Sequence, residues 1–378
     1  MDVRLQWLAF HRVCWTQPQR AWNLLLRCGS LAHLLYASQA DLPSLVEGDW
    51  QIIEQLRSKL NWAHATRDLE YMTTHHIQML LRGHEGYPIL LEEINDPPIL
   101  LFWRGNDRIS LNHSTVSVVG TRKPTPYGLQ MTEEIVSVLA ARGHVIVSGL
   151  AFGIDACAHH AALDAGGTTI AILASGVDDI TPHRHYKLGH WIVNQGALCS
   201  EVPLGMPAHA SHFLWRNRII SGFSYSTLIV ECCQKSGTMV TATHAADQGR
   251  DVFAVPGPLS SAMSAGPNYL LEQGAYRCLS ADDILNPKAV EIQEDKKYGH
   301  SKALDDTTTR LLKLISTEPR SSNQLAEALQ IPITQILQSV TMLECEGLIQ
   351  VLPNGLLLCP THSSSSNHQP KPPPSKNI

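Results

Sequence analysis

The chain reads Val116-Ser-Val-Val-Gly120-Thr-Arg122, then a helix-like run to Arg142, then Val145-Ile-Val-Ser148-Gly149-Leu-Ala-Phe-Gly153-Ile-Asp155. Two short β-branched runs joined by a helix of about six turns have the spacing of a βαβ unit, because a parallel return needs a long crossover. Each run ends on glycine, which lets the backbone turn sharply and point its N–H groups at open space. This geometry suits a phosphate or another anion beyond the strands.

The alternation of strand and helix continues beyond this stretch. The runs Ile170-Ala-Ile-Leu-Ala and Leu228-Ile-Val are continuously apolar, as in strands covered on both faces. The sequence therefore predicts an α/β fold with a Rossmann-like, doubly wound and mostly parallel sheet of about seven strands. An extra strand is expected over 99–103, and the prolines of segment 86–98 argue against a helix there. The further core strands are predicted at 168–174, 197–201, 227–232, 251–255 and 275–278.

The regions on either side of this core predict separate domains. Residues 1–80 show helical apolar spacing, including a helix over 50–60, and form a helical domain. The core spans 81–287, a polar linker spans 288–304, and the Ser/Pro-rich tail 361–378 is expected to be disordered. Within 305–360, three helices at 308–316, 322–329 and 333–346 precede a hairpin around Asn354-Gly355, which predicts a winged helix. The third of these helices contains no lysine or arginine, so contact with another protein is at least as well supported as DNA binding.

Composition limits the class of protein. A net charge of −5 and a pI near 6.4 argue against a surface coated with nucleic acid, although a local basic groove is compatible with them. Nine cysteines without Cys-Xaa-Xaa-Cys spacing give no disulfide framework or zinc site, and most are expected in the core. No apolar run is long enough to span a membrane and no signal peptide is recognisable, so a cytoplasmic protein is expected. The first helix lacks the Gly-Xaa-Gly-Xaa-Xaa-Gly fingerprint, so no dinucleotide cofactor is predicted.

Several ordered motifs over about 86–280 resemble one family. They are Gly120-Thr-Arg122, Ser148-Gly-Leu-Ala-Xaa-Gly-Ile-Asp155-Xaa-Xaa-Ala-His159, Arg216-Asn-Arg218-Ile-Ile-Ser221 and Ser236-Gly237-Thr238. This series looks like the signature of the DNA-processing protein A (DprA/Smf) family. The resemblance implies a non-catalytic protein that binds and protects incoming single-stranded DNA in natural transformation and recombination. It also implies that the protein loads the recombinase RecA and forms a homodimer through the core, and that the N-terminal domain is related to sterile-alpha-motif and helix-hairpin-helix modules.

The candidate DNA-binding residues cluster where predicted strands end. Arg122 can hold a phosphate through paired hydrogen bonds, and Lys123 can extend the track of positive charge. Arg184 and Lys187 follow the third strand, where Thr181 replaces the tyrosine usual in the family. Phe213 or Trp215 offers a ring for stacking. The full predicted set is Gly120, Arg122, Lys123, Ser148, Gly149, Gly153, Arg184, Lys187, Phe213, Arg216, Asn217, Arg218, Ser236, Gly237 and Thr238.

The same motifs contain residue types that occur in catalytic centres. Ser148, Asp155 and His159 can be mistaken for a hydrolase triad, but no nucleophile elbow exists, and Asp155 and His159 are interpreted as structural residues that shape the pocket floor. The 236–238 loop is similar to that of the nucleotide-hydrolysing "lonely guy" proteins, whose glutamate is absent here. No metal-ligand cluster appears at the strand ends. Two alternatives remain open: a nucleotide-processing enzyme of that related superfamily, and a winged-helix transcription regulator.

Overall fold

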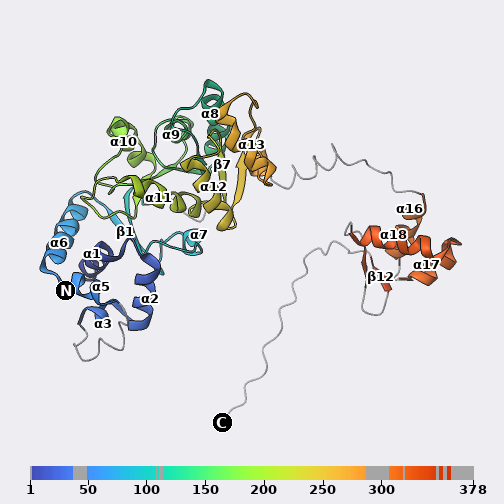
Figure 1. Cartoon of the computed structure of the whole chain (residues 1–378), viewed down its shortest axis with the longest axis horizontal. Helices are drawn as coiled ribbons and strands as arrows, with labels where there is room; N and C mark the ends of the chain where they lie inside the picture. The colour runs from blue at the N-terminus through green and yellow to red at the C-terminus, as the bar shows by residue number, and fades with distance from the viewer. Residues whose placement is uncertain are drawn as a thin grey trace, which may run out of the picture. The chain divides into compact units, whose positions relative to one another are not determined.

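The computed structural model describes residues 2–36, 49–107, 109, 114–286, 306–317, 320–345, 349–351 and 356–358. The chain divides into two compact units, Met1–Ala289 and Val290–Ile378 (Figure 1). The predicted linker 288–304, the predicted tail 361–378 and the hairpin turn Asn354-Gly355 lie outside the described residues.

The first unit is built on a nine-stranded sheet in the order β1-β2-β6-β5-β4-β3-β7-β8-β9. The seven strands from β6 to β9 in this order are all paired in parallel, which confirms the predicted doubly wound sheet. They are β3 (Thr115–Val119), β4 (Val145–Ser148), β5 (Thr169–Ile172), β6 (Ala197–Ser200), β7 (Ser226–Ile229), β8 (Asp251–Ala254) and β9 (Tyr276–Arg277).

Two antiparallel strands extend this sheet beyond β6. The predicted extra strand is β2 (Leu100–Gly105), and it pairs with β6 on one side and with β1 (Gln78–Leu81) on the other. No pattern in the sequence separates β1 from the preceding helices. The expectation that segment 86–98 is free of helix is wrong, because α7 (Ile89–Glu92) lies within it. Pro88 precedes the first turn of α7, where a proline ring removes no helical hydrogen bond.

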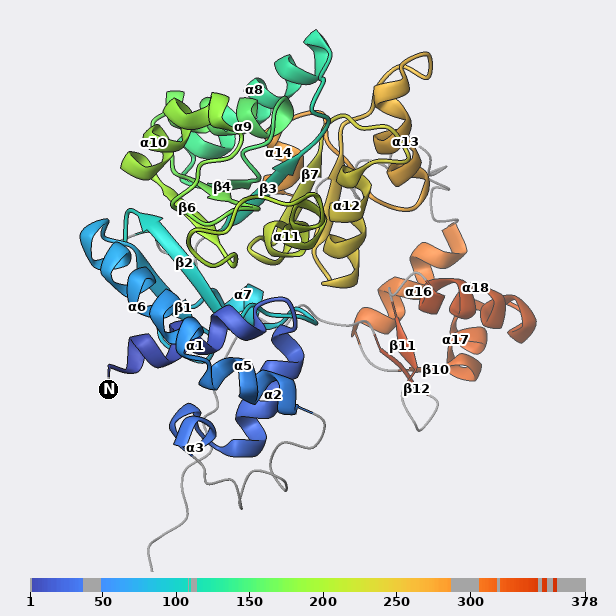
Figure 2. The same ribbon diagram turned by 60° about the vertical axis from the view of Figure 1, so that its left-hand side comes forward.

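Helices cover both faces of the sheet (Figure 2). On one face, α8 (Pro126–Ala141), α9 (Ile154–Asp164) and α14 (Ala281–Leu285) pack on Val118 and its neighbours. On the other face, α7, α11 (Ala210–Gly222) and α12 (Gly237–Asp247) pack on Val119. Helix α8 has 16 residues, so it is shorter than the predicted six turns. It begins only at Pro126, because Thr125 caps it by accepting a hydrogen bond from the Gly128 N–H.

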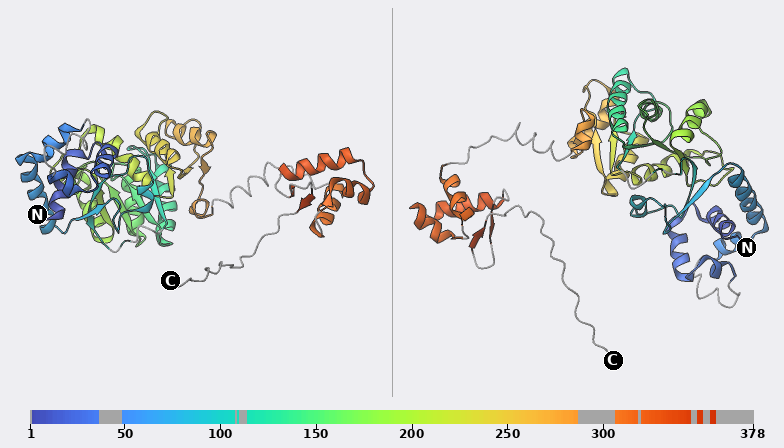
Figure 3. Two further views of the ribbon diagram at one scale, coloured as in Figure 1. Left: turned by 90° about the horizontal axis from the view of Figure 1, so that it is seen from below. Right: turned by 180° about the vertical axis from the view of Figure 1, so that it is seen from behind.

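The N-terminal helices share a hydrophobic core with the sheet. Phe10 of α1 belongs to one buried cluster with Leu100 and Phe102 of β2 and with Leu188 of α10. Figure 3 shows these helices against the β1–β2 end of the unit. The N-terminal helices are α1 (Val3–Cys14), α2 (Pro18–Cys28), α3 (Leu31–Tyr36), α5 (Trp50–Arg57) and α6 (Lys59–Thr74). The remaining helical elements of the first unit are η1 (His183–His185), α10 (Tyr186–Gln195), η2 (Ala262–Ser264) and α13 (Ala265–Glu272).

The second unit is a winged helix, as the sequence predicts. Leu311, Leu325 and Leu343, one from each of its three helices, are fully buried in its own core. A capping box at Ser321 fixes the start of the second helix. The elements are α16 (Asp306–Thr317), β10 (Arg320–Ser321), α17 (Ser322–Leu329), α18 (Ile333–Cys345), β11 (Gln350–Val351) and β12 (Leu356–Leu358), with strands in the order β10-β12-β11.

Candidate functional site

A cavity of about 680 Å³ opens beyond the carboxyl ends of β3 and β7. Open parallel sheets bind ligands at this edge, because the loops there are free to approach a ligand. We call this cavity the groove. The residues of the predicted set that line it are Gly120, Arg122, Lys123, Phe213, Arg216, Asn217, Ser236, Gly237 and Thr238.

The loop that carries Arg122 and Lys123 is held in place by a buried carboxylate. Glu231, which follows β7, accepts hydrogen bonds from the Thr125 N–H at 2.9 Å and from the Thr125 hydroxyl at 2.7 Å. The Glu231 carbonyl also accepts from the Thr121 N–H at 2.6 Å. A carboxylate that accepts several hydrogen bonds is a strong anchor. The loop after β3 is therefore fixed to the neighbouring strand on both sides of its two cations.

The loop after β4 closes the groove from beneath. Gly153 has φ of +81°, and a Cβ there would lie 2.3 Å from the Thr121 carbonyl oxygen, so only glycine fits. Asp155 is buried and its Oδ2 accepts from the N–H groups of Gly149 at 3.2 Å and Ala151 at 3.4 Å. It therefore orders the loop before its own helix, and it lines the groove. Burial raises the pKa of Asp155, and the nearby Arg216 opposes this shift.

Arg216 forms the floor of the groove rather than a free phosphate ligand. Its residue exposure is 5%, and Nη1 donates to the carbonyl oxygens of Gly149, at 2.8 Å, and of Ile172. A Cβ on Gly149 would meet the guanidinium at 2.6 Å, so the glycine makes room for the arginine. Burial lowers the pKa of Arg216 to about 10, which leaves it charged at neutral pH. The buried positive charge adds to the potential of the groove while its hydrogen bonds join β4 to β5.

Exposed cations and one ring form the wall of the groove. Arg122, Lys123 and Lys235 are all exposed. The Arg122 guanidinium lies 5.2 Å from the centroid of the Phe213 ring, a cation–π distance. Lys235 lines the groove as well, although it is absent from the predicted set. Its position after β7 was the signal that could have identified it.

The start of α12 opens into the same cavity. Ser236, Gly237 and Thr238 line it, and the first N–H groups of an α-helix have no acceptor within the helix. Two contacts fix this helix end to the rest of the groove. The Thr238 hydroxyl donates to the Gly120 carbonyl at 3.1 Å, and Asn217 Nδ2 donates to the Gly237 carbonyl at 3.2 Å. Asn217 therefore helps to position the helix terminus, and its contact with DNA stays a prediction.

The remaining predicted residues lie elsewhere. Ser148 is fully buried and donates to the Val118 carbonyl at 2.6 Å, so it acts as a structural residue. Arg184 is on η1 and Lys187 is on α10, and both are exposed but absent from the groove lining. The predicted residues outside the lining are Ser148, Gly149, Gly153, Arg184, Lys187 and Arg218.

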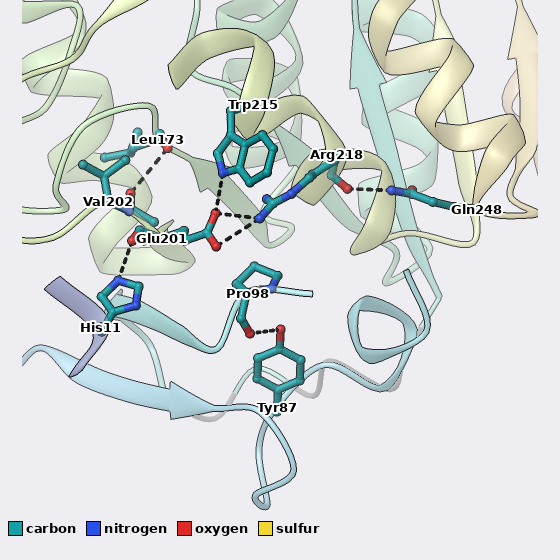
Figure 4. A network of polar contacts seen from close by, with 10 residues as sticks. His11, Tyr87, Pro98, Leu173, Glu201, Val202, Trp215, Arg218 and Gln248 are labelled. Atoms are coloured by element: carbon teal, nitrogen blue, oxygen red, sulfur yellow. Dashed lines mark hydrogen bonds and ion pairs between the residues drawn. The ribbon is translucent and has the colours of Figure 1, made fainter. Parts of the chain in front are cut away.

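Arg218 lies on the opposite side of α11 from the groove floor, in a buried ion pair. Its Nη2 donates to both carboxylate oxygens of Glu201, at 3.0 and 2.8 Å (Figure 4). Trp215 donates to the same carboxylate at 3.1 Å, and its ring lies 4.3 Å from the Arg218 guanidinium carbon. Burial raises the pKa of Glu201, and Arg218 opposes that shift. Trp215 is therefore not a stacking ring of the groove.

His159 is also structural, as the sequence suggested, but it lies away from the groove. Its ring is fully buried, and Nδ1 lies 2.7 Å from the Thr169 hydroxyl oxygen. That hydroxyl donates to the Ile146 carbonyl, so the histidine Nδ1 is the donor in the first contact. In the part of the chain that the structure describes, no group of three His, Cys, Asp or Glu side chains is placed to hold a metal ion. No helix in these residues is both long and apolar enough to cross a membrane.

The sequence matches known families in both units. The model of the family described as "DNA recombination-mediator protein A" matches residues 78–288, and that of the "DprA winged helix domain" matches residues 296–355. Protein Smf of Escherichia coli (strain K12) is 38% identical over 281 residues, which cover 72% of this chain and 74% of that protein. The DNA processing protein DprA of Bacillus subtilis (strain 168) is 41% identical over 198 residues, covering 52% and 67% of the two chains.

Two solved structures share this fold. The structure of DNA processing protein A from Streptococcus pneumoniae is 30% identical, has a TM-score of 0.62, and covers 75% of this chain and 98% of that one. The structure of DNA processing protein A from Helicobacter pylori is 31% identical, has a TM-score of 0.51, and covers 57% and 96% of the two chains. That second structure is described as revealing a single-stranded DNA binding mode of its own protein.

Proposed function

Because the chain belongs to the DNA-processing protein A (DprA/Smf) family, we propose that it binds single-stranded DNA in the groove beyond the carboxyl ends of β3 and β7. The observation that carries this proposal is the combination of exposed cations and one aromatic ring in a single cavity. Arg122, Lys123 and Lys235 supply charge for phosphates, and Phe213 supplies a ring. Single-stranded nucleic acid is held by this combination without sequence readout.

The helix terminus in the groove supports the same ligand. An anion placed beside Ser236, Gly237 and Thr238 meets the N–H groups at the start of α12 and the positive end of its dipole. The buried charge of Arg216 stabilises the same anion from below. The H. pylori relative, whose own structure concerns single-stranded DNA binding, supports the ligand class independently of this geometry.

Family membership supports a proposal about the role of this DNA binding in the cell. We propose that the protein protects incoming single strands in natural transformation and homologous recombination, and that it loads RecA onto them. The protein acts in the cytoplasm as a homodimer and does not catalyse a reaction on the DNA. An assay for cleavage of the glycosidic bond of nucleotides separates this role from that of a nucleotide-processing enzyme, which would release a free base.

Changing Arg122 to alanine should weaken binding of single-stranded DNA by about 1.5–3 kcal/mol, because one charged contact is lost. Filter binding across a salt series measures this effect. The groove offers roughly three to five phosphate contacts, so the wild-type log affinity should fall with log salt at a slope of roughly −2 to −4. The variant should show a slope that is shallower by about 0.7.

Arg67→Ala is the matched control, because Arg67 is an exposed arginine on α6 that lies outside the groove lining. It should leave both affinity and slope unchanged. Duplex DNA of the same length should bind more weakly than the single strand. Equal affinity for the two DNA forms would contradict a preference for single strands. A folded Arg122→Ala protein with wild-type affinity would reject the groove as the binding site.

Deleting residues 305–378 should leave most single-strand affinity in place. The third helix of the winged unit, α18, has no lysine or arginine and therefore offers little to a phosphate backbone. The first unit has its own hydrophobic clusters, which the deletion does not touch. Filter binding of the truncated protein, with its fold checked by circular dichroism, measures the result. A folded truncated protein that no longer binds would place the main site in the winged unit.

A further inference from the structure

A second cavity lies next to the groove, within the first unit. It has a volume of about 480 Å³, which is in the range of about 300–1,000 Å³ usual for ligand sites. Helices α11 and α12 and the residue after α1, Trp15, form its walls. We call it the aromatic pocket, and the lining residues that matter here are Trp15, Asp96, His212, Leu214, Trp215 and Val240.

The two cavities are neighbours across one side chain. Leu214 of α11 is 50% exposed and lines both the groove and the aromatic pocket. Phe213 lies on the groove side of it, and Trp215 lies on the pocket side. A strand in the groove therefore lies beside the pocket, with Leu214 between the two cavities.

The walls of the pocket suit a flat ring. The edge of Trp15 meets His212 with the ring centroids 5.0 Å apart. The indole of Trp215 is fixed by its N–H···Glu201 hydrogen bond and by Arg218 beside it (Figure 4). Rings that are already held in one orientation lose little conformational entropy when a ligand stacks on them. The pocket is therefore organised for an aromatic ligand before one arrives.

The charge of the pocket disfavours a phosphate. Among the described residues that line it, Arg218 is the one lysine or arginine, and its charge is already paired with Glu201. Burial lowers the pKa of both His212 and His244, which favours the neutral form of these rings. Asp96 adds a half-buried carboxylate. A negatively charged group would be repelled here, whereas a neutral ring that bears an amino group would be attracted.

We propose that the aromatic pocket receives one nucleobase of the same DNA strand whose phosphates lie in the groove. The base packs against the ring system of Trp15, His212 and Trp215. Asp96 accepts a hydrogen bond from its exocyclic amino group, so cytosine, adenine or guanine is favoured over thymine. This inference rests on the proposed function, because it takes the strand in the groove as given, and adds to it a site that selects among bases.

A scan with 2-aminopurine tests the proposal on the full-length protein. This fluorescent base replaces each position of an oligothymidine in turn, and its emission falls when it stacks on an aromatic ring. We expect one position to be strongly quenched on binding. In the Val240→Glu protein, which places a charged chain in the pocket, that quenching should disappear and affinity for this oligonucleotide should fall about fivefold to 100-fold, the range for one stacked base.

Val138→Glu is the matched control. Val138 on α8 is a valine of similar exposure, 39% against 36% for Val240, and lies outside both cavities. It should keep wild-type quenching and affinity. Loss of quenching in Val240→Glu alone supports the pocket. The inference is overturned if the quenching persists in Val240→Glu. It is also overturned if the wild type binds tightly but no position is quenched. Both outcomes leave the groove proposal intact. A wild type that binds no single strand overturns the proposed function itself.

Asp96→Asn keeps the test decisive if Val240→Glu fails to fold. At the quenched position, cytosine should bind wild-type protein several-fold more tightly than thymine, because only cytosine offers an amino donor to the carboxylate. An amide both donates and accepts, so the asparagine variant should bind the two bases equally. Equal binding of the two bases by the wild type, or a preference that Asp96→Asn retains, contradicts the role of Asp96 and the placement of a base beside it.

Discussion

Replacing Glu201 with alanine should lower the free energy of unfolding by about 3–5 kcal/mol, among the largest effects of any single substitution in this chain. The carboxylate and the Arg218 guanidinium are only 2% and 5% exposed, so removal of Glu201 leaves an uncompensated charge in the core. Trp215 loses its acceptor at the same time. Urea denaturation followed by circular dichroism measures the change.

Two further variants separate charge burial from the loss of a contact. Asp282→Ala removes an ion pair of similar length, Arg142–Asp282 at 2.7 Å, whose side chains are half exposed or more, and should cost only about 0–1 kcal/mol. The double change Glu201→Leu with Arg218→Leu should be less destabilising than Glu201→Ala, because no charge is then left alone. A Glu201→Ala protein as stable as Asp282→Ala would contradict this account of the pair.

Lowering the pH from about 7.5 to about 4.5 should destabilise the protein, with about 2–3 kcal/mol from each of two buried histidines. Burial lowers the pKa of His11 to about 4 and that of His159 to about 3. A histidine in the unfolded chain has a pKa near 6.5. Below that pH these two histidines are therefore protonated in the unfolded chain but stay neutral in the folded protein until the pH approaches their lowered pKa values. This contribution to stability is complete above about pH 6.5 and is lost as the pH falls toward 4.

Variants that cannot titrate isolate this effect from that of the carboxylates. Asp155 and Glu201 have raised pKa values, so they favour the folded state as the pH falls and partly offset the histidines. His11→Gln and His159→Asn each place an amide donor where the bonded ring nitrogen stands. Their stability, measured by urea denaturation at both pH values, should change less than that of the wild type. His33→Gln on the exposed side of α3 is the control. Equal pH dependence in all four proteins would rule out this origin.

The sheet could be predicted because its pattern is local. A strand buried on both faces favours a continuous apolar run, and the runs Ile170-Ala-Ile-Leu-Ala and Leu228-Ile-Val overlap β5 and β7. Strand β1 could not be separated in this way, since its four residues follow helix α6 after a short turn and pair with β2 at the edge of the sheet. Its identity as a strand comes from that partner, which is a tertiary contact.

The sequence predicts those groove residues that lie in the loops directly after the parallel strands. Gly120, Arg122 and Gly237 come together because parallel strands end at one edge. Arg216 and Arg218 are two residues apart on one helix, and no local signal distinguishes them from surface cations. Their burial follows from partners distant in the chain. Arg216 donates to the carbonyl groups of Gly149, directly after β4, and of Ile172 in β5, and Arg218 pairs with Glu201. The same limit hid the role of Glu231 in fixing Thr125.

The shared core of the N-terminal helices and β2 separates two kinds of boundary in this protein. The family match begins at residue 78, so sequence similarity places one domain boundary there. The hydrophobic core defines a larger folded unit, because Leu100 and Phe102 are buried in one cluster with Phe10 and Leu24 from the preceding helices. A fragment cut at residue 78 would present that apolar sheet face to water and would favour aggregation. In homologues without these helices, we expect this face either to be covered by other elements or to carry polar side chains. The N-terminal region and the composition of β2 should therefore change together during evolution.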